Sequence, residues 1–131
     1  MKFRNTFRRP VLMALGLVFA VSSAQAAVIG DVKDTKKGMK QAINCHYDKA
    51  IERLDTAIAG GGFAAELAVL EKVAVMLDAG YEEEAMNLLD ERNESVGASE
   101  EDIAEAEESV KQTVEALRDE REKQTGSRTC P

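Results

Sequence analysis

The sequence predicts an all-α protein made of two helical hairpins and a long acidic C-terminal helix. Three observations support this fold class. Apolar residues recur at three- and four-residue spacing, glycines separate the periodic segments, and no stretch shows the two-residue alternation of a half-buried strand. Five helices in one domain, residues 27–131, therefore account for the chain beyond its N-terminal segment.

The first 26 residues have the pattern of a bacterial secretory signal peptide. An apolar stretch, VLMALGLVFAV, is followed by Ala24-Gln25-Ala26, a small-x-small end. A basic start without acids precedes it, comprising Lys2, Arg4, Arg8 and Arg9. The sequence thus predicts cleavage after Ala26 and a periplasmic or secreted protein with no stable membrane insertion after cleavage.

Two other interpretations of this segment stay open. An uncleaved anchor is one, because Val11 to Ile29 is just long enough to cross a hydrocarbon core. A twin-arginine signal is the other, because Arg8-Arg9 precedes the apolar stretch, and it would export a protein that is already folded. A lipoprotein is not expected, since the residue directly after the predicted cut is Ala27 and not a cysteine.

The mature chain would be strongly acidic. Its 13 Lys and Arg oppose all 24 Asp and Glu of the sequence, a net charge of −11. This charge argues against nucleic acid as a partner. The one basic cluster is interpreted as a solvated helix face, with a docking patch for acidic partners or lipid head groups as the alternative. It consists of Lys33, Lys36, Lys37 and Lys40.

The two cysteines, Cys45 and Cys130, both lie in the predicted exported part. An oxidising compartment and an even number favour one intramolecular disulfide. Pairing of Cys130 with another chain is the alternative, because that residue lies next to the C-terminus.

The first expected helix runs from about Val32 to Asn44 and contains Gly38 in its middle. The second runs from about Asp48 to Ala59 and ends at three consecutive glycines. Its apolar face is expected to comprise Ala50, Ile51, Leu54, Ala57 and Ile58.

The third expected helix, about Phe63 to Asp78, has the clearest apolar stripe. The stripe comprises Phe63, Leu67, Leu70, Val73, Ala74 and Leu77. The fourth helix, about Glu82 to Asn93, starts with three glutamates, which favour the positive end of the helix dipole. Its expected buried residues are Ala85, Met86, Leu88 and Leu89.

The fifth helix, residues 99–124, is expected to open at Ser99 with Asp102 three residues on, which resembles a capping box. Its apolar seam is narrow, as in a helix that covers one flank of a bundle; it comprises Ile103, Ala106, Val110, Val114 and Leu117. Gly126 is the expected stop, and residues 125–131 form a short tail.

Residues 34–93 resemble a pair of tetratricopeptide repeats. Tyr47, with Ala50 three residues later and Ala57 seven beyond that, matches the second helix of such a repeat, and Gly38 falls at a small position of the first. Ala85 follows Ala50 by 35 residues, close to the repeat period. The residues that would pack the repeats are Gly38, Tyr47, Ala50, Leu54, Ala57, Tyr81, Ala85 and Leu89. The aromatic and leucine of the first repeat's first helix are missing.

The stretch Cys45-His46-Tyr47 does not predict chemistry. A thiol nucleophile and its base must converge, whereas neighbours on a helix point about 100° apart. A zinc or copper site lacks enough His and Cys ligands, and the acidic runs lack the spacing of a calcium loop. We therefore expect no enzyme activity and no cofactor.

The resemblance implies a protein–protein interaction module whose partner is another protein of the cell envelope. The expected contact surface lies between the first and third helices and comprises Met39, Ile43, Leu67 and Leu70, residues that could equally belong to the core. The alternative is an acidic periplasmic stress chaperone or inhibitor, whose carboxylates would neutralise in acid and loosen the bundle.

Overall fold

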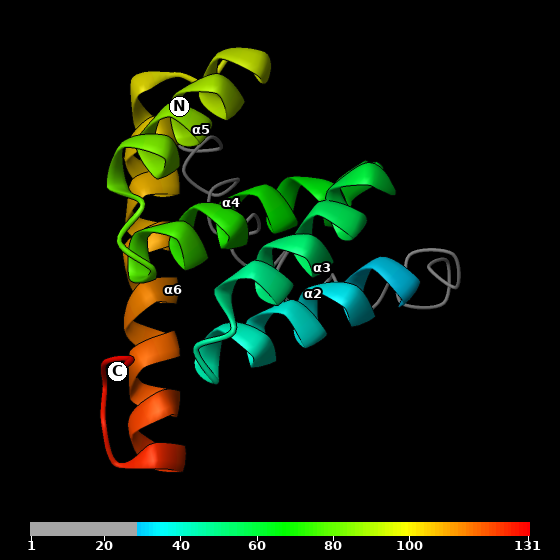
Figure 1. The fold of residues 1–131 in the computed structure, drawn as a ribbon. Helices are drawn as coiled ribbons and strands as arrows, with labels where there is room; N and C mark the ends of the chain where they lie inside the picture. The colour runs from blue at the N-terminus through cyan, green and yellow to red at the C-terminus, as the bar shows by residue number, and fades with distance from the viewer. Residues whose placement is uncertain (1–28) are drawn as a thin grey trace, which may run out of the picture. The chain divides into compact units, whose positions relative to one another are not determined.

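A computed structural model describes residues 29–131, and the all-α class is confirmed (Figure 1). Five helices follow one another in this part of the chain, with no strand between them: α2 (Ile29–Ile43), α3 (Tyr47–Ala59), α4 (Gly62–Asp78), α5 (Glu82–Ser95) and α6 (Glu100–Thr125). The predicted signal peptide lies outside the described residues. None of the helices in the described residues is both long and apolar enough to cross a membrane.

Short corners join the helices where the sequence predicted breaks. Cys45 turns the chain between α2 and α3 with a positive φ of 66°, a conformation uncommon for any residue but glycine. The predicted capping box is present, since the Ser99 side chain accepts from the Asp102 amide and the Asp102 carboxylate accepts from the Ser99 amide. Gly126, at φ 86°, ends α6 in the left-handed region.

The core is built largely from alanine and valine, which lets the helices approach closely. α4 is central, because it packs against α3, α5 and α6. One buried cluster comprises Ala42, Ala50, Leu54, Ala57, Ala68, Val75 and Leu117, and the other comprises Val73, Ala74, Ala85, Leu89, Ala106, Val110 and Val114. Gly38 marks the closest approach of α2 to α3, since a Cβ there would lie 3.1 Å from the Ala50 carbonyl oxygen.

The burial expected on α5 was wrong at Met86, which is 37% exposed. On the α4 stripe, Phe63 and Leu67 are 60% and 47% exposed. Other faces of α4 are buried instead, through Ala64, Ala68 and Val75. The reason is that α4 is contacted on three sides, so its buried surface is wider than one stripe, while its N-terminal half extends beyond the reach of α6.

Candidate functional site

An apolar face of α4 is covered in one half and exposed in the other. Phe63, Leu67, Leu70 and Ala74 recur at three- and four-residue spacing and share one side of the helix. Ala74 is fully buried in the cluster that contains Val110 of α6. In Figure 1, α6 lies across the C-terminal end of α4. The N-terminal half of the same face, at Phe63 and Leu67, is therefore left uncovered in the described domain.

Helix α2 runs in the same direction as α4, because α3 returns the chain between them (Figure 1). Its Met39 and Ile43 line one groove together with Glu71 of α4 and Leu117 of α6. Val32, two turns before Met39, is 44% exposed. Both α2 and α4 thus carry exposed apolar side chains, and a groove lies between these two helices and α6.

The groove holds about 390 Å³ and contains one carboxyl group, that of Glu71. Its remaining lining residues are uncharged; besides Met39, Ile43 and Leu117 they are Ser109, Gln112, Thr113 and Ala116 of α6. Burial raises the pKa of Glu71 to about 7. Within residues 29–131 no cation or hydrogen-bond donor pairs with this carboxylate. The groove therefore contains a carboxylate that no cation of the described residues neutralises, and the side chains around it are uncharged.

A second polar cluster lies where α6 meets the ends of α2 and α4. The side chains of Arg121 and Asp78 are only 1% and 2% exposed, and Arg121 Nη2 lies 2.6 Å from Asp78 Oδ2. Arg118 donates from Nε to the other carboxylate oxygen at 3.0 Å. Burial disfavours the charged form of Asp78, but hydrogen bonds from Arg121, Tyr47 and Arg118 outweigh it and lower the pKa of this carboxyl.

Arg121 also closes the end of α2 and holds the C-terminal tail. Its guanidinium donates to the carbonyls of Ile43 at 3.0 Å and Ala42 at 2.8 Å, two acceptors that the end of a helix leaves without an intrahelical donor. It donates as well to the Arg128 carbonyl at 2.7 Å. One side chain thereby joins α2, α4, α6 and the tail.

The disulfide lies beside this cluster. Cys45 and Cys130 are bonded, with the sulfurs 2.00 Å apart. The Tyr47 hydroxyl donates to Asp78 Oδ2 at 2.8 Å and lies 2.9 Å from the Cys130 sulfur. Burial and the hydrogen bond to Asp78 raise the pKa of Tyr47 to about 12. Tyr47 is thus a partly buried anchor between the hairpin corner, α4 and the tail.

The structure does not bring Cys45 and His46 together as a nucleophile and its base. The sulfur of Cys45 is in the disulfide, and Nδ1 of the exposed His46 lies 3.1 Å from the Gln41 side-chain oxygen. The described residues contain no group of three or more His, Cys, Asp or Glu that could hold a metal ion.

The residues proposed to pack the repeats lie mostly at helix contacts. Those that are buried are Gly38, Ala50, Leu54, Ala57, Ala85 and Leu89. Tyr47 is partly buried, whereas Tyr81 is 42% exposed.

The four residues proposed as a partner surface are not one patch. Met39 and Ile43 line the groove, Leu67 is exposed on α4, and Leu70 lies in a separate hollow with Val96 of the α5–α6 corner.

Sequence reasoning missed Asp78, Arg121 and Glu71. Arg121 continues the α6 seam four residues after Leu117, so its position on the buried side could have been found from spacing alone. Asp78 ends α4, where an acid is unfavourable unless a cation compensates it. Nothing in the sequence distinguishes Glu71 from the other glutamates.

No protein family, curated protein or solved structure matches this chain. The fold and the site geometry are therefore the basis of the functional argument.

Proposed function

We propose that this protein is an exported, non-enzymatic interaction module whose α2 and α4 bind an amphipathic helix of another cell-envelope protein. The observation that carries the proposal is the half-covered face of α4. Ala74 is buried in the cluster that includes Val110 of α6, while Phe63 and Leu67 on the same face are 60% and 47% exposed. Large apolar residues that are exposed together on one helix face are typical of contact sites.

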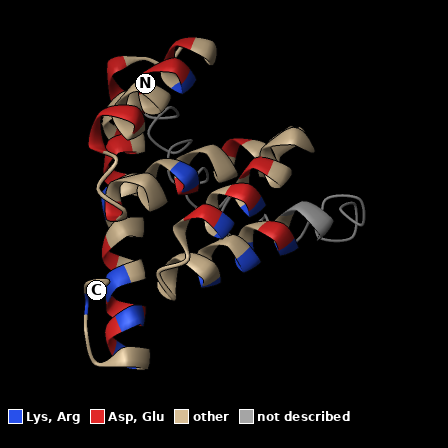
Figure 2. Ribbon diagram, viewed as in Figure 1, with Lys and Arg blue, Asp and Glu red and all other residues tan. Residues whose placement is uncertain are grey.

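The chain itself indicates which occupant this face accepts. α6 binds the C-terminal half of the face through a narrow seam that includes Val110 and Val114. A partner helix with a similar seam could bind the free half by the same packing, in the manner of helix-in-groove recognition. Residues 61–131 hold 19 acidic and seven basic side chains, and acidic residues recur along α5 and α6 (Figure 2). Because the exposed lysines of α2 act against a cation on their own side, a partner helix with Lys and Arg on the flank that faces α4 and α6 is favoured.

Two further features support this proposal. The Cys45–Cys130 disulfide is typical of proteins in oxidising compartments, which agrees with the predicted export. The parallel course of α2 and α4, with Gly38 against Ala50, supports a divergent tetratricopeptide-like hairpin pair.

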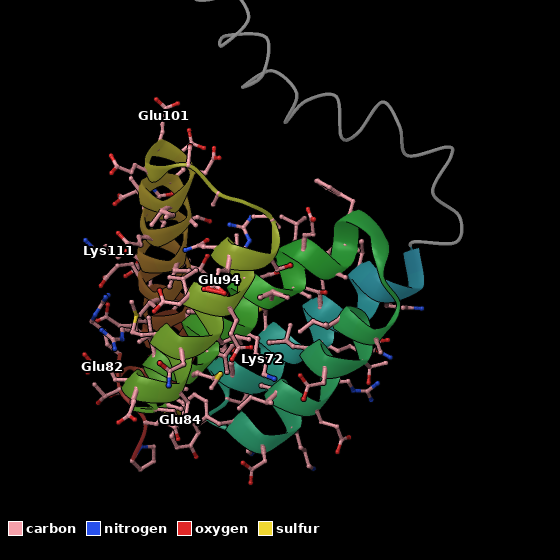
Figure 3. The ribbon with its side chains drawn as sticks, turned by 90° about the horizontal axis from the view of Figure 1, so that it is seen from above. Lys72, Glu82, Glu84, Glu94, Glu101 and Lys111 are labelled. Atoms are coloured by element: carbon pink, nitrogen blue, oxygen red, sulfur yellow. A yellow bond between two sulfur atoms is a disulfide. The ribbon has the colours of Figure 1, made fainter. Side chains whose placement is uncertain are left out.

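Site-specific photocrosslinking in cells tests the proposal. A photoreactive phenylalanine analogue replaces Leu67 in one variant and Lys111 in the control variant. Lys111 is exposed and points away from the other helices (Figure 3). We expect a discrete adduct from position 67 and none from position 111, with the crosslinked peptide belonging to an amphipathic helix that carries basic flanks.

A further substitution makes this experiment more specific. Phe63→Asp places a charge on the exposed apolar face one turn from Leu67, and we expect it to abolish the adduct while circular dichroism stays unchanged. Equal adducts from positions 67 and 111, or crosslinked segments without an apolar seam, would overturn the proposal.

A further inference from the structure

Glu71 is the one charged residue among those that line the groove between α2, α4 and α6. The lining residues from α2 are Met39 and Ile43, and those from α6 carry hydroxyl, amide or aliphatic side chains. The charged form of this partly buried carboxylate is disfavoured, because it loses part of its hydration without an ion pair from the described residues, and a cation bound in the groove would stabilise it.

No cation of the described domain forms an ion pair with the Glu71 carboxylate. Lys72, the neighbour of Glu71 on α4, is bound to Asp55 of α3 at 2.7 Å. Lys36 and Lys40 of α2 are exposed and form no ion pair with Glu71 in the described residues. The aliphatic side chains of Met39, Ile43 and Leu117, together with the single acid, match a side chain that is apolar along its length and cationic at its end.

We infer that Glu71 receives the Lys or Arg side chain of the docked helix, with the aliphatic part of that side chain against Met39, Ile43 and Leu117. This inference rests on the proposed function and specifies the chemistry of its partner. The bound cation would replace the water that Glu71 loses, and the charge-assisted hydrogen bond would select a basic helix over a neutral one.

The same geometry makes the selection dependent on pH. Because burial raises the pKa of Glu71 to about 7, the carboxylate is charged in mildly alkaline solution and neutral in mildly acidic solution. Preference for a cation should therefore be present above about pH 7 and lost as the pH falls below about 6.

Two small probes with the same carbon chain test this inference: n-hexylammonium and 1-hexanol. Their binding is measured on the wild-type protein by NMR through the methyl group of Met39, which lines this groove, whereas Ile43 also lines a second hollow beside the disulfide. At about pH 8 we expect hexylammonium to bind about threefold to tenfold more tightly than hexanol, and equally at about pH 5.5.

Glu71→Gln is the decisive variant, and Glu66→Gln, an exposed glutamate on the same helix, is its matched control. We expect Glu71→Gln to abolish the preference for the ammonium at every pH, while binding of hexanol stays unchanged. Glu66→Gln should retain the preference. A preference that survives in Glu71→Gln, or equal binding of both probes to the wild type at about pH 8, would overturn the inference.

The two proposals fail separately. If position 67 crosslinks to an amphipathic helix but the probes show no preference, helix docking stands and the role of Glu71 falls. If the probes show the preference but position 67 yields no specific adduct, the groove binds cations and the proposed function falls.

Discussion

Arg121 Nη2 lies 2.6 Å from Asp78 Oδ2, and both side chains are almost fully buried. The pair connects a residue of α6 to one 43 positions earlier, at the last turn of α4. Arg121 also donates to the final carbonyls of α2 and to the tail, so the guanidinium compensates one charge and three carbonyl groups. This contact determines how α6 lies on the two hairpins.

Removal of one partner of this pair should destabilise the domain strongly. We expect Arg121→Met to lower the free energy of unfolding by about 3 to 5 kcal/mol, because Asp78 would remain buried without compensation. In the double variant Arg121→Met with Asp78→Leu, the free energy of unfolding should decrease less than in Arg121→Met alone. Urea unfolding followed by circular dichroism, with the disulfide intact, measures both.

Lys123→Met is the matched control on the same helix, since its ammonium is 74% exposed and lies 3.7 Å from Glu120. This substitution should lower the free energy of unfolding by less than about 1 kcal/mol. If Arg121→Met were no more destabilising than Lys123→Met, the central role of the buried pair would be refuted.

The disulfide should contribute a large share of the stability of this small domain. Cys45 and Cys130 are 85 residues apart, and closing a loop of that length stabilises the folded state by about 4 to 5 kcal/mol in the chain-entropy model. We expect Cys130→Ser to lower the free energy of unfolding by a few kcal/mol and to migrate more slowly on a non-reducing gel. Unchanged mobility would show that the bond does not form within the chain.

Tyr47 should titrate at unusually high pH. Its pKa of about 12 means that the native state retains a proton between about pH 10 and 12 that the unfolded state releases. The contribution of Tyr47 to stability is thus present below about pH 10 and is lost as the pH rises through about 12. The ultraviolet difference titration of wild type minus Tyr47→Phe should give a midpoint near 12; a midpoint near 10 would contradict the buried hydrogen bond to Asp78.

Glu71 should weaken the fold in alkaline solution. Its pKa is about 7 in the folded state and ordinary in the unfolded state. The contribution of Glu71 to stability is therefore most favourable below about pH 4.5 and decreases as the pH rises through about 7. We expect Glu71→Gln to raise the free energy of unfolding by about 1 to 3 kcal/mol at pH 8 and to change it little at pH 4.5. Urea unfolding at both values measures the effect, with Glu66→Gln as the control. A stabilisation equal at both pH values would contradict the assigned cause.

Mild acid should leave the helical bundle intact. The pKa of Asp78 is lowered, so its contribution is present above about pH 4 and is lost only as the pH falls further through the native value. Protonation of Glu71 and relief of the net negative charge act in the stabilising direction. We expect no increase in the fluorescence of a dye for exposed apolar surface between about pH 7 and 4. A rise in that range would instead favour the acid-responsive chaperone.

Much of the local structure could be predicted from the sequence, because it depends on nearby residues. The corner at Gly60–Gly62, the Ser99–Asp102 cap and the stop at Gly126 follow from backbone freedom and from hydrogen bonds a few residues apart. The helical periodicity predicted the number and order of the helices in residues 29–131 for the same reason.

Burial could not be predicted as well, because it depends on which helix covers which face. Phe63 and Leu67 continue the same stripe as Ala74, yet only the crossing position of α6 decides which of them is covered. A periodic pattern identifies the apolar side of a helix but does not determine how far along the helix its neighbour extends.

By itself, the sequence determined an acidic all-α chain, the ends of its helices and the two cysteines available for a disulfide. Only the tertiary structure decided that Asp78 and Arg121 form a buried pair. It also decided that no cation of residues 29–131 pairs with Glu71, while apolar residues on α2 and α4 stay exposed. The physical reason is that helix periodicity and capping act over a few residues, whereas desolvation and charge pairing depend on groups brought together from distant positions of the chain.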